Sequence, residues 1–323
     1  LLYNQPPRGL DVKLNISLTL QNRADEALGN AKGAVVVLNA DSGEIYALAS
    51  HPGFDSNNLN ENWESLMASA DAPLLNRSTQ SAYPLGTLGH FFLLIQDLQT
   101  PVLSGLTPER SRHIDPFCLE AMQSRVTALD QERFGCKLDP RFEPDRQVLE
   151  ETFALMQQLQ LNKAPSIFLE TIEASTLPNT AEAYTYQNLE DFKVSPLQMA
   201  LVAGAITDEG WYSEPRLVNS YLDDDGEWKT FDNLITDFQA VSRDLAIAVQ
   251  ERLSAADETL WYQMGHCKTA EGKPLTWLIG GNTSIWKGSH LALAVLVEDS
   301  APVLVQEIAQ QLLGGEPPAT PAP

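Results

Sequence analysis

The chain has 323 residues, of which 43% are hydrophobic, and its 43 acidic residues against 21 basic ones give a formal net charge of −22 at pH 7. This composition is typical of folded globular proteins, and so acidic a chain, whose Lys and Arg residues are scattered, repels phosphate backbones and anionic lipid surfaces. Nucleic acid is therefore excluded as a partner, and no apolar run approaches the roughly 20 residues that a membrane-spanning helix needs.

The N-terminal part of the chain predicts a strand, a helix and a hairpin. Apolar and polar residues alternate over 11–20, which is typical of a half-buried strand, and the apolar residues of 21–28 follow at helical spacing. Two apolar runs, 33–38 and 44–50, flank a polar turn that ends in a glycine, which is a strong hairpin signal. The Asn-rich segment 51–60 predicts a loop.

The middle third has a mainly helical pattern that prolines interrupt. Its clearest helix is 147–161, whose apolar residues form one stripe. A second helix is predicted over 195–210, because Ser195 can cap it, Pro196 suits its first position and a glycine stands at its end. Residues 240–254 follow a third helical pattern.

The last third returns to strands. They are predicted at 217–222, 265–270, 275–280 and 290–297, and a final helix at 302–313. Hairpins first, helices in the middle, then strands and a terminal helix predict an α+β fold with an antiparallel sheet flanked by helices. We expect one domain over 1–313 and a Pro/Ala-rich tail over 314–323.

Several segments, in the same order, resemble the transpeptidase domain of the penicillin-binding proteins, the membrane-anchored enzymes that cross-link peptidoglycan. The matching segments are 33–45 (the opening hairpin), 50–58 (SHPGFDSNN), 71–84, 194–200 (VSPLQMA), 277–280 and 291–298. The resemblance covers about 9–313. It implies a β-lactamase-like fold with a mainly helical subdomain, no cofactor, and an extracytoplasmic place in the cell envelope, with a membrane anchor that lies outside this chain.

The family's nucleophile motif, Ser-x-x-Lys, corresponds here to Thr87 and His90. Residues i and i+3 share a helix face, so a desolvated Lys can take the serine proton as the hydroxyl attacks a carbonyl. Thr87 keeps a hydroxyl, although its methyl group crowds the attack, and His90 is a base by its ordinary pKa. Two interpretations follow: a working Thr–His pair, or a helix cap beside a packed or surface histidine.

The family's second motif, Ser-x-Asn, gives a hydroxyl and an amide to the proton relay. No Ser-x-Asn occurs between Thr87 and Lys163, and the positional match is Gly135 and Lys137, which flank Cys136. Neither residue brings the hydroxyl or the amide.

The third motif, Lys-Thr-Gly, lies on the edge strand and binds the substrate's carboxylate and backbone. Its best match in the sequence is Lys268, Thr269 and Ala270. The Cβ of an Ala narrows the groove where a substrate strand approaches, and Glu271 stands where the family's residue gives a backbone N–H to the oxyanion hole. The sequence therefore favours a merely structural strand.

The cysteines and histidines predict no metal site. Cys118, Cys136 and Cys267 are widely spaced, so one disulfide plus a thiol and three thiols both remain open. His266 and Cys267 are adjacent on a predicted strand and point to opposite faces, so they do not ligate one zinc ion together with His290.

Loss of all three motifs predicts a pseudo-transpeptidase that acts by binding a cell-wall synthesis or division protein. The alternative is an active penicillin-binding D,D-transpeptidase or carboxypeptidase that uses the Thr-x-x-His variant on a peptidoglycan stem peptide. A third reading keeps non-covalent binding of a wall fragment or β-lactam in the old cleft.

Overall fold

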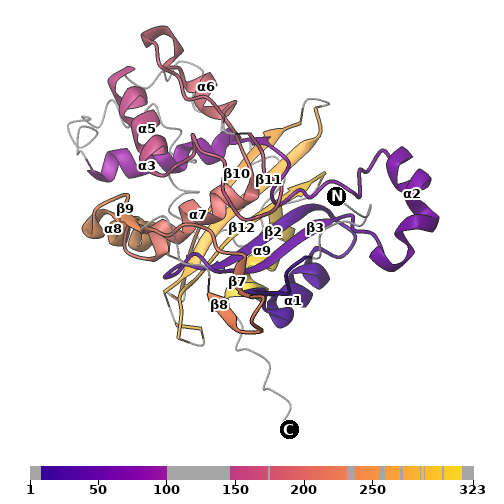
Figure 1. The fold of residues 1–323 in the computed structure, drawn as a ribbon. Coiled ribbons are helices and arrows are strands. Elements are labelled where there is room, and N and C mark those ends of the chain that lie inside the picture. The colour runs from indigo at the N-terminus through magenta and orange to yellow at the C-terminus, as the bar shows by residue number, and fades with distance from the viewer. Residues whose placement is uncertain are drawn as a thin grey trace.

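The computed structural model describes residues 9–99, 146–173, 175–230, 237–254, 259–269, 272–283, 285–286, 288–299 and 302–314. Its centre is a five-stranded antiparallel sheet in the order β10-β11-β12-β2-β3 (Figure 1). The strands are β2 (Lys32–Asn39), β3 (Ile45–His51), β10 (Leu260–Lys268), β11 (Pro274–Asn282) and β12 (Leu291–Glu298). The predicted β2–β3 hairpin is confirmed, as is the α+β class.

Both faces of this sheet are buried, which explains the continuous apolar runs of its strands. In β2, Val35 and Val37 belong to the core under α1 (Leu18–Leu28) and α9 (Pro302–Leu313), whereas Val36 and Leu38 belong to the larger core on the opposite face. Successive residues of a strand point to opposite faces, so a sheet between two helical layers needs apolar residues at every position. The prediction for 302–313 is confirmed to the residue.

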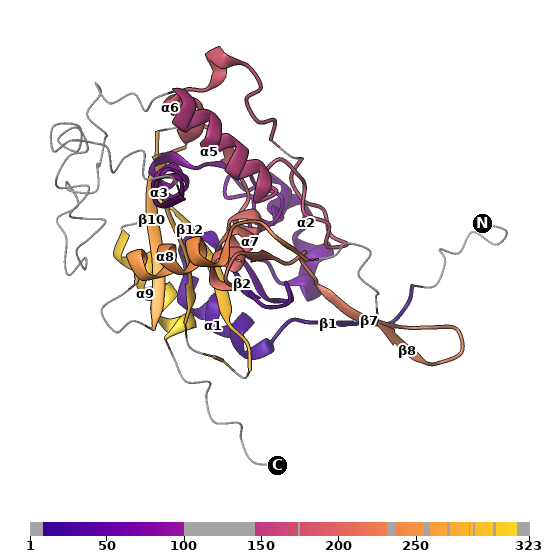
Figure 2. The same ribbon diagram turned by 90° about the vertical axis from the view of Figure 1, so that its left-hand side faces the viewer.

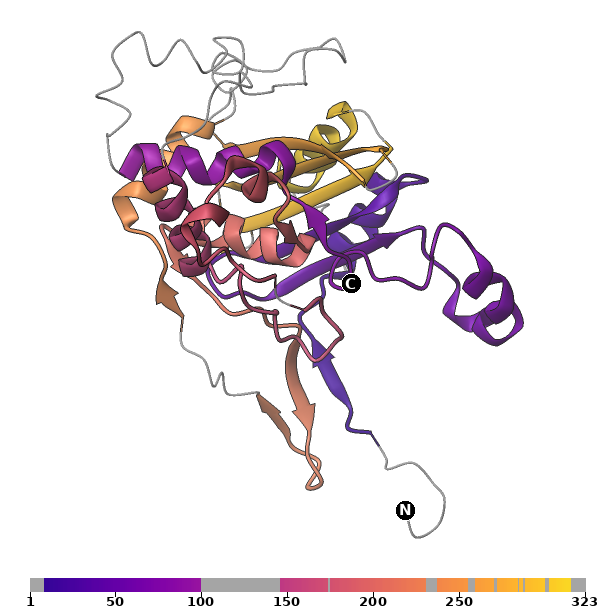
Figure 3. The same cartoon turned by 90° about the horizontal axis from the view of Figure 1, so that it is seen from above.

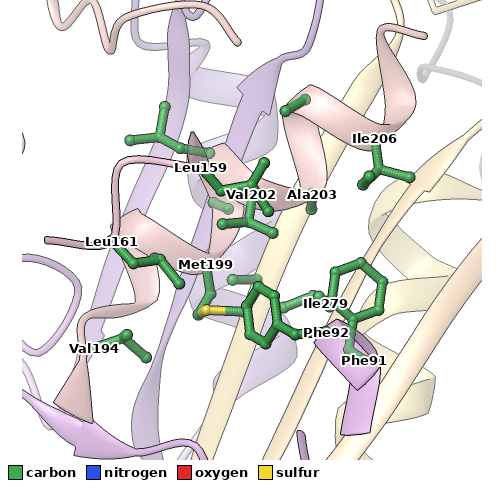
Figure 4. Packing of buried hydrophobic residues seen from close by; sticks show 14 of the residues in the cluster. Phe91, Phe92, Leu159, Leu161, Val194, Met199, Val202, Ala203, Ile206 and Ile279 are labelled. Atoms are coloured by element: carbon green, nitrogen blue, oxygen red, sulfur yellow. The ribbon is translucent and has the colours of Figure 1, made fainter. Parts of the chain in front are cut away.

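The helix α7 (Pro196–Thr207) forms the centre of the larger core, and every one of its residues is buried. Ser195 accepts from the Gln198 backbone N–H and the Gln198 side chain accepts from the Ser195 N–H, so the predicted cap is present as a capping box with Pro196 at the first turn. Figure 4 shows side chains of α7, among them Met199, facing Phe92 of α3 and Ile279 of β11.

Four other described helices contribute residues to the larger core. They are α3 (His90–Gln99), α5 (Arg146–Gln158), α6 (Tyr186–Glu190) and α8 (Arg243–Leu253). The helices predicted at 147–161 and 240–254 are confirmed with slightly different bounds. No helix in the described ranges is both long and apolar enough to cross a membrane.

Residues 11–20 differ from the prediction of a half-buried strand. Only β1 (Val12–Leu14) is a strand, its residues are exposed, and α1 begins at Leu18. Leu20, Ala24 and Leu28 lie four residues apart and bury one helical stripe against the sheet. The alternation of apolar and polar residues continues to residue 20, but contact with the sheet makes the chain helical from Leu18 onward.

Two parts of the molecule project from the body (Figures 2 and 3). One is a three-stranded arm in which β7 (Val218–Leu222) pairs with both β1 and β8 (Trp228–Thr230). The other is α2 (Leu59–Ala68), which follows the short 3-10 turn η1 (Ser56–Asn58). The sequence analysis predicted a loop over 51–60 and no helix at the position of α2.

Short elements complete the described chain. The strand β4 (Tyr83–Pro84) pairs with β5 (Lys193–Val194), β6 (Trp211–Tyr212) pairs with β9 (Phe238–Gln239), and η2 (Gly86–Gly89) and η6 (Ala181–Ala183) are 3-10 turns. The strand predicted at 265–270 begins earlier, at Leu260. Only Gly314 of the predicted tail lies within the described residues.

Candidate functional site

The site begins with η2, the turn that leads directly into α3. Gly86 has a φ of +55°, a conformation that favours glycine, and a Cβ here would overlap the carbonyl oxygen of His266. From the other side, a Cβ on Gly265 of β10 would overlap the backbone of Leu88. These two glycines allow the turn to lie directly against the edge strand of the sheet.

Thr87 uses its hydroxyl to bind that strand. Its Oγ1 accepts a hydrogen bond from the His266 backbone N–H at 2.8 Å. The interpretation of Thr87 as a helix cap is wrong, because the N-cap position of η2 is Leu85 and the threonine hydroxyl binds β10 instead. The Thr87 hydroxyl thus acts as a structural acceptor that joins η2 to β10.

His90 is a packed histidine at the start of α3. Its side chain is 6% exposed, and its Nε2 shares a hydrogen bond with the Tyr186 hydroxyl of α6. The two rings lie 5.5 Å apart between centroids with 32° between their planes. Burial lowers the pKa of His90 from 6.5 to about 4, so the imidazole is neutral at pH 7 and a weak base. Thr87 and His90 make these hydrogen bonds to two different elements.

The outer edge of β10 is the edge of the whole sheet. In an antiparallel pair alternate residues bond the neighbouring strand, and Thr269 N donates to Lys273 O at the turn into β11. Odd-numbered residues of β10 therefore bond β11, and even-numbered residues point their backbone N–H and C=O groups away from β11, toward the open edge of the sheet. Two of these outward groups are occupied, because the His266 N–H donates to Thr87 and the Gln263 side-chain amide donates to the Met264 carbonyl at 2.8 Å.

Lys268 and Thr269, the predicted carboxylate-binding pair, lie at the far end of β10. Lys268 is exposed, and the Thr269 hydroxyl accepts from the Lys273 N–H at 3.3 Å within the turn to β11. Ala270, Gly135 and Lys137 lie outside the described residues.

The residues of β10 that lie against η2 are Gly265, His266 and Cys267. Sequence reasoning missed this segment. The signal was present, because a glycine inside an apolar strand marks a place where another backbone approaches closely. Lys268 and Thr269, which begin three residues after Gly265, matched the family's motif better by residue type.

Cys267 is half-buried beside the turn. Its Sγ donates to the Pro84 carbonyl at 3.3 Å, and desolvation raises its pKa to about 12, so the thiol stays protonated. It forms no disulfide with a described residue, while Cys118 and Cys136 lie outside the described ranges. Within those ranges no three His, Cys, Asp or Glu residues are grouped to hold a metal ion.

Parts of this chain are similar in sequence to known proteins. The peptidoglycan D,D-transpeptidase PbpA of Mycolicibacterium smegmatis is 26% identical over 280 residues, which is 78% of this chain and 57% of that protein. The peptidoglycan D,D-transpeptidase MrdA of Acinetobacter baumannii is 37% identical over 87 residues, 25% of this chain and 13% of the relative. The chain thus spans only part of these relatives. No protein-family model matches it.

Solved structures resemble the molecule over nearly its whole length. Penicillin-binding protein A from M. tuberculosis, solved as an imipenem acyl-enzyme, superposes with a TM-score of 0.70 at 21% identity and covers 96% of this chain and 80% of its own. The D,D-transpeptidase domain of an Eggerthella lenta peptidoglycan glycosyltransferase gives 0.70 at 20% identity, over 95% of this chain and 83% of its own. The chain therefore has the fold of the transpeptidase domain of the penicillin-binding proteins.

Proposed function

We propose that this transpeptidase-fold domain does not catalyse acyl transfer and acts in cell-wall synthesis or division by binding a protein partner. The observation that carries the proposal is the pairing at the nucleophile position. The Thr87 hydroxyl accepts from the His266 N–H, and the buried His90 shares its hydrogen bond with Tyr186. The side chain that stands in for the family's base is thus engaged elsewhere, and burial lowers its pKa to about 4.

Acyl transfer needs a nucleophile with a base, donors aimed at the developing oxyanion, and room for the substrate. Here the His266 N–H, which faces the nucleophile, already donates to Thr87. The Met264 carbonyl on the open strand edge is satisfied by the Gln263 amide. A substrate strand would have to displace both contacts before it could pair with β10.

We further propose that Gln263, Met264 and Gly265 stand at the position of the Lys-Thr-Gly motif. The family's residue after that glycine gives a backbone N–H to the oxyanion hole, and His266, which follows Gly265, donates its N–H to Thr87. In this register a neutral amide replaces the lysine that binds a carboxylate. Lys268 and Thr269 remain the sequence-based alternative, and their place beside the β11 turn does not favour it.

An active Thr-x-x-His enzyme is the second candidate. It is favoured by one observation, because Thr87 lies within hydrogen-bonding distance of a backbone N–H that could also stabilise an oxyanion. The curated relatives are named D,D-transpeptidases.

Intact-protein mass spectrometry after incubation with excess benzylpenicillin separates the two candidates. The proposal predicts no added mass on the wild type after hours. A stoichiometric adduct that Thr87→Ala abolishes would overturn it and make Thr87 the nucleophile. An adduct that persists in Thr87→Ala is chemistry at another side chain, which peptide mapping identifies.

A further inference from the structure

The helix α2 is amphipathic, yet none of its 10 residues is buried. Leu59, Trp63, Leu66 and Met67 follow at i, i+4, i+7 and i+8 and so form one stripe. The Trp63 side chain is 49% exposed and that of Met67 62%. Figure 3 shows the helix standing away from the sheet. A helix of this length is marginal in water unless its apolar face is covered.

The base of α2 is held firmly to the body. Arg77, only 2% exposed, donates from Nη2 to the Asp71 carbonyl at 2.6 Å and from Nη1 to the Ala72 carbonyl at 3.1 Å. Its Nε donates to the Glu298 carboxylate of β12 at 3.1 Å. A buried arginine thus fixes the chain where it returns from α2, and a helix presented from a fixed base loses less entropy on docking.

The charge around the stripe has one sign. Residues 52–76 contain four carboxylates and no Lys, Arg or His; the acids are Asp55, Glu61, Glu64 and Asp71. Lys32 approaches only the base of the segment, 4.0 Å from Asp71. The exposed Phe54 adds a further apolar side chain next to the acids. A partner that covers this surface needs apolar groups for the stripe and cations for its rim.

We propose that α2 is a docking helix that lays Leu59, Trp63 and Met67 into an apolar groove bordered by Lys and Arg on another protein. Helix-in-groove binding uses this spacing of anchors, and tryptophan is enriched among the residues that dominate such interfaces. A second copy of this chain is a poor occupant because each carries a net charge of −22. The inference rests on the partner-binding part of the proposed function and is independent of whether Thr87 can be acylated.

The test is photocrosslinking of the full-length protein in its own cells. The crosslinker p-benzoylphenylalanine replaces Trp63 or Met67 on the stripe, or, as matched controls, Ser65 or Ala68 on the opposite face of the same helix. A further position, Val12 on the exposed β1, samples the projecting arm. We expect a discrete product with a second protein from the two stripe positions and none from the two controls.

Competition then tests the chemistry. Purified wild-type domain added to a lysate reduces the product, whereas the Trp63→Ser/Met67→Ser variant competes about tenfold less well or worse. Raising the salt concentration weakens the product because the rim contacts are ionic. Since α2 buries no residue, this variant keeps the thermal midpoint of the wild type.

Each other outcome overturns the inference. A product of twice the chain's own mass indicates self-association, and a lipid adduct indicates a membrane surface. Equal products from both faces of α2, or equal competition by the variant, mean that the stripe is not the docking element. A product from Val12 alone overturns the role of α2 but keeps partner binding, whereas no protein product from any position overturns both.

Discussion

The Thr87 hydroxyl and the His266 N–H form a bond between a turn and a strand that lie 179 residues apart in sequence. Thr87→Val keeps the shape of the side chain and leaves the half-buried N–H without its acceptor. We expect this variant to lose about 1–2 kcal/mol of unfolding free energy, measured by urea denaturation. Thr87→Ser retains the oxygen and serves as the control. Equal stability of the two variants would show that the bond adds nothing to the fold.

His90 makes stability depend on pH. Burial lowers its pKa from 6.5 to about 4 in the folded state, so below pH 6.5 the unfolded chain binds a proton that the folded protein does not. The free energy of unfolding therefore falls as the pH drops from about 6.5 to 4, and this contribution is constant above that window.

The matched measurement compares wild type with His90→Gln. Between pH 7.5 and pH 4.5 we expect the wild type to lose about 2–3 kcal/mol more than the variant. His266, whose pKa burial also lowers to about 4, is present in both proteins and cancels. Parallel pH profiles would mean that His90 takes up a proton as readily in the folded protein as in the unfolded chain.

At the scale of elements, a buried ion pair ties the segment after α2 to β12. Glu298 accepts from Arg77 and from the Tyr83 hydroxyl at 3.0 Å, and Lys32 lies 3.3 Å from its other oxygen. Arg77→Met removes one partner and leaves a largely buried carboxylate, so we expect a loss of about 3 kcal/mol or more.

The control for Arg77→Met is Lys273→Met, which breaks the exposed pair of Lys273 with Asp299 at 2.9 Å. Exposed pairs contribute little, so its urea midpoint should stay near that of the wild type. If both variants shift the midpoint equally, burial of Arg77 is not the source of the effect.

Local patterns predicted the elements whose packing agrees with their own periodicity. The hairpin of 33–38 and 44–50, the capped helix after Ser195 and the helix 302–313 all carry signals within a few residues of each other. The strand prediction for residues 11–20 was wrong beyond β1. The alternation of apolar and polar residues continues into α1, but contact with the sheet stabilises a helix there. α2 was not predicted because the Asn-rich segment 51–60 favoured a loop, although the apolar residues of 59–67 follow at helical spacing.

At the scale of the whole molecule, two cores share one sheet. Val35 and Val36 are adjacent and fully buried, but they belong to different cores. We expect Val35→Ala and Val36→Ala each to cost about 2 kcal/mol. Because the strands link both cores, each variant should unfold in a single transition by calorimetry, as one domain over 1–313 requires. Two separate transitions would divide the chain into independent units.

The candidate site depends on contacts that no local pattern contains. Thr87 and His90 could be found from a motif, but their partners His266 and Tyr186 are distant in sequence. The register in which η2 docks on β10 decides which residue of the strand lies at the turn. The sequence does not contain this register, so the motif match led to Lys268 and Thr269 and not to Gly265. Tertiary register decides this part of the site.

The partly occupied edge of β10 also affects the tendency of the protein to aggregate. A strand at the border of a sheet offers unpaired amides and carbonyls that can recruit a strand from another molecule and start aggregation. An enzyme that accepts an extended peptide along such a border must leave it accessible and bear that hazard. Here η2 and the Gln263 amide occupy part of the border, so fewer backbone groups of β10 are open to pairing with a strand of another molecule.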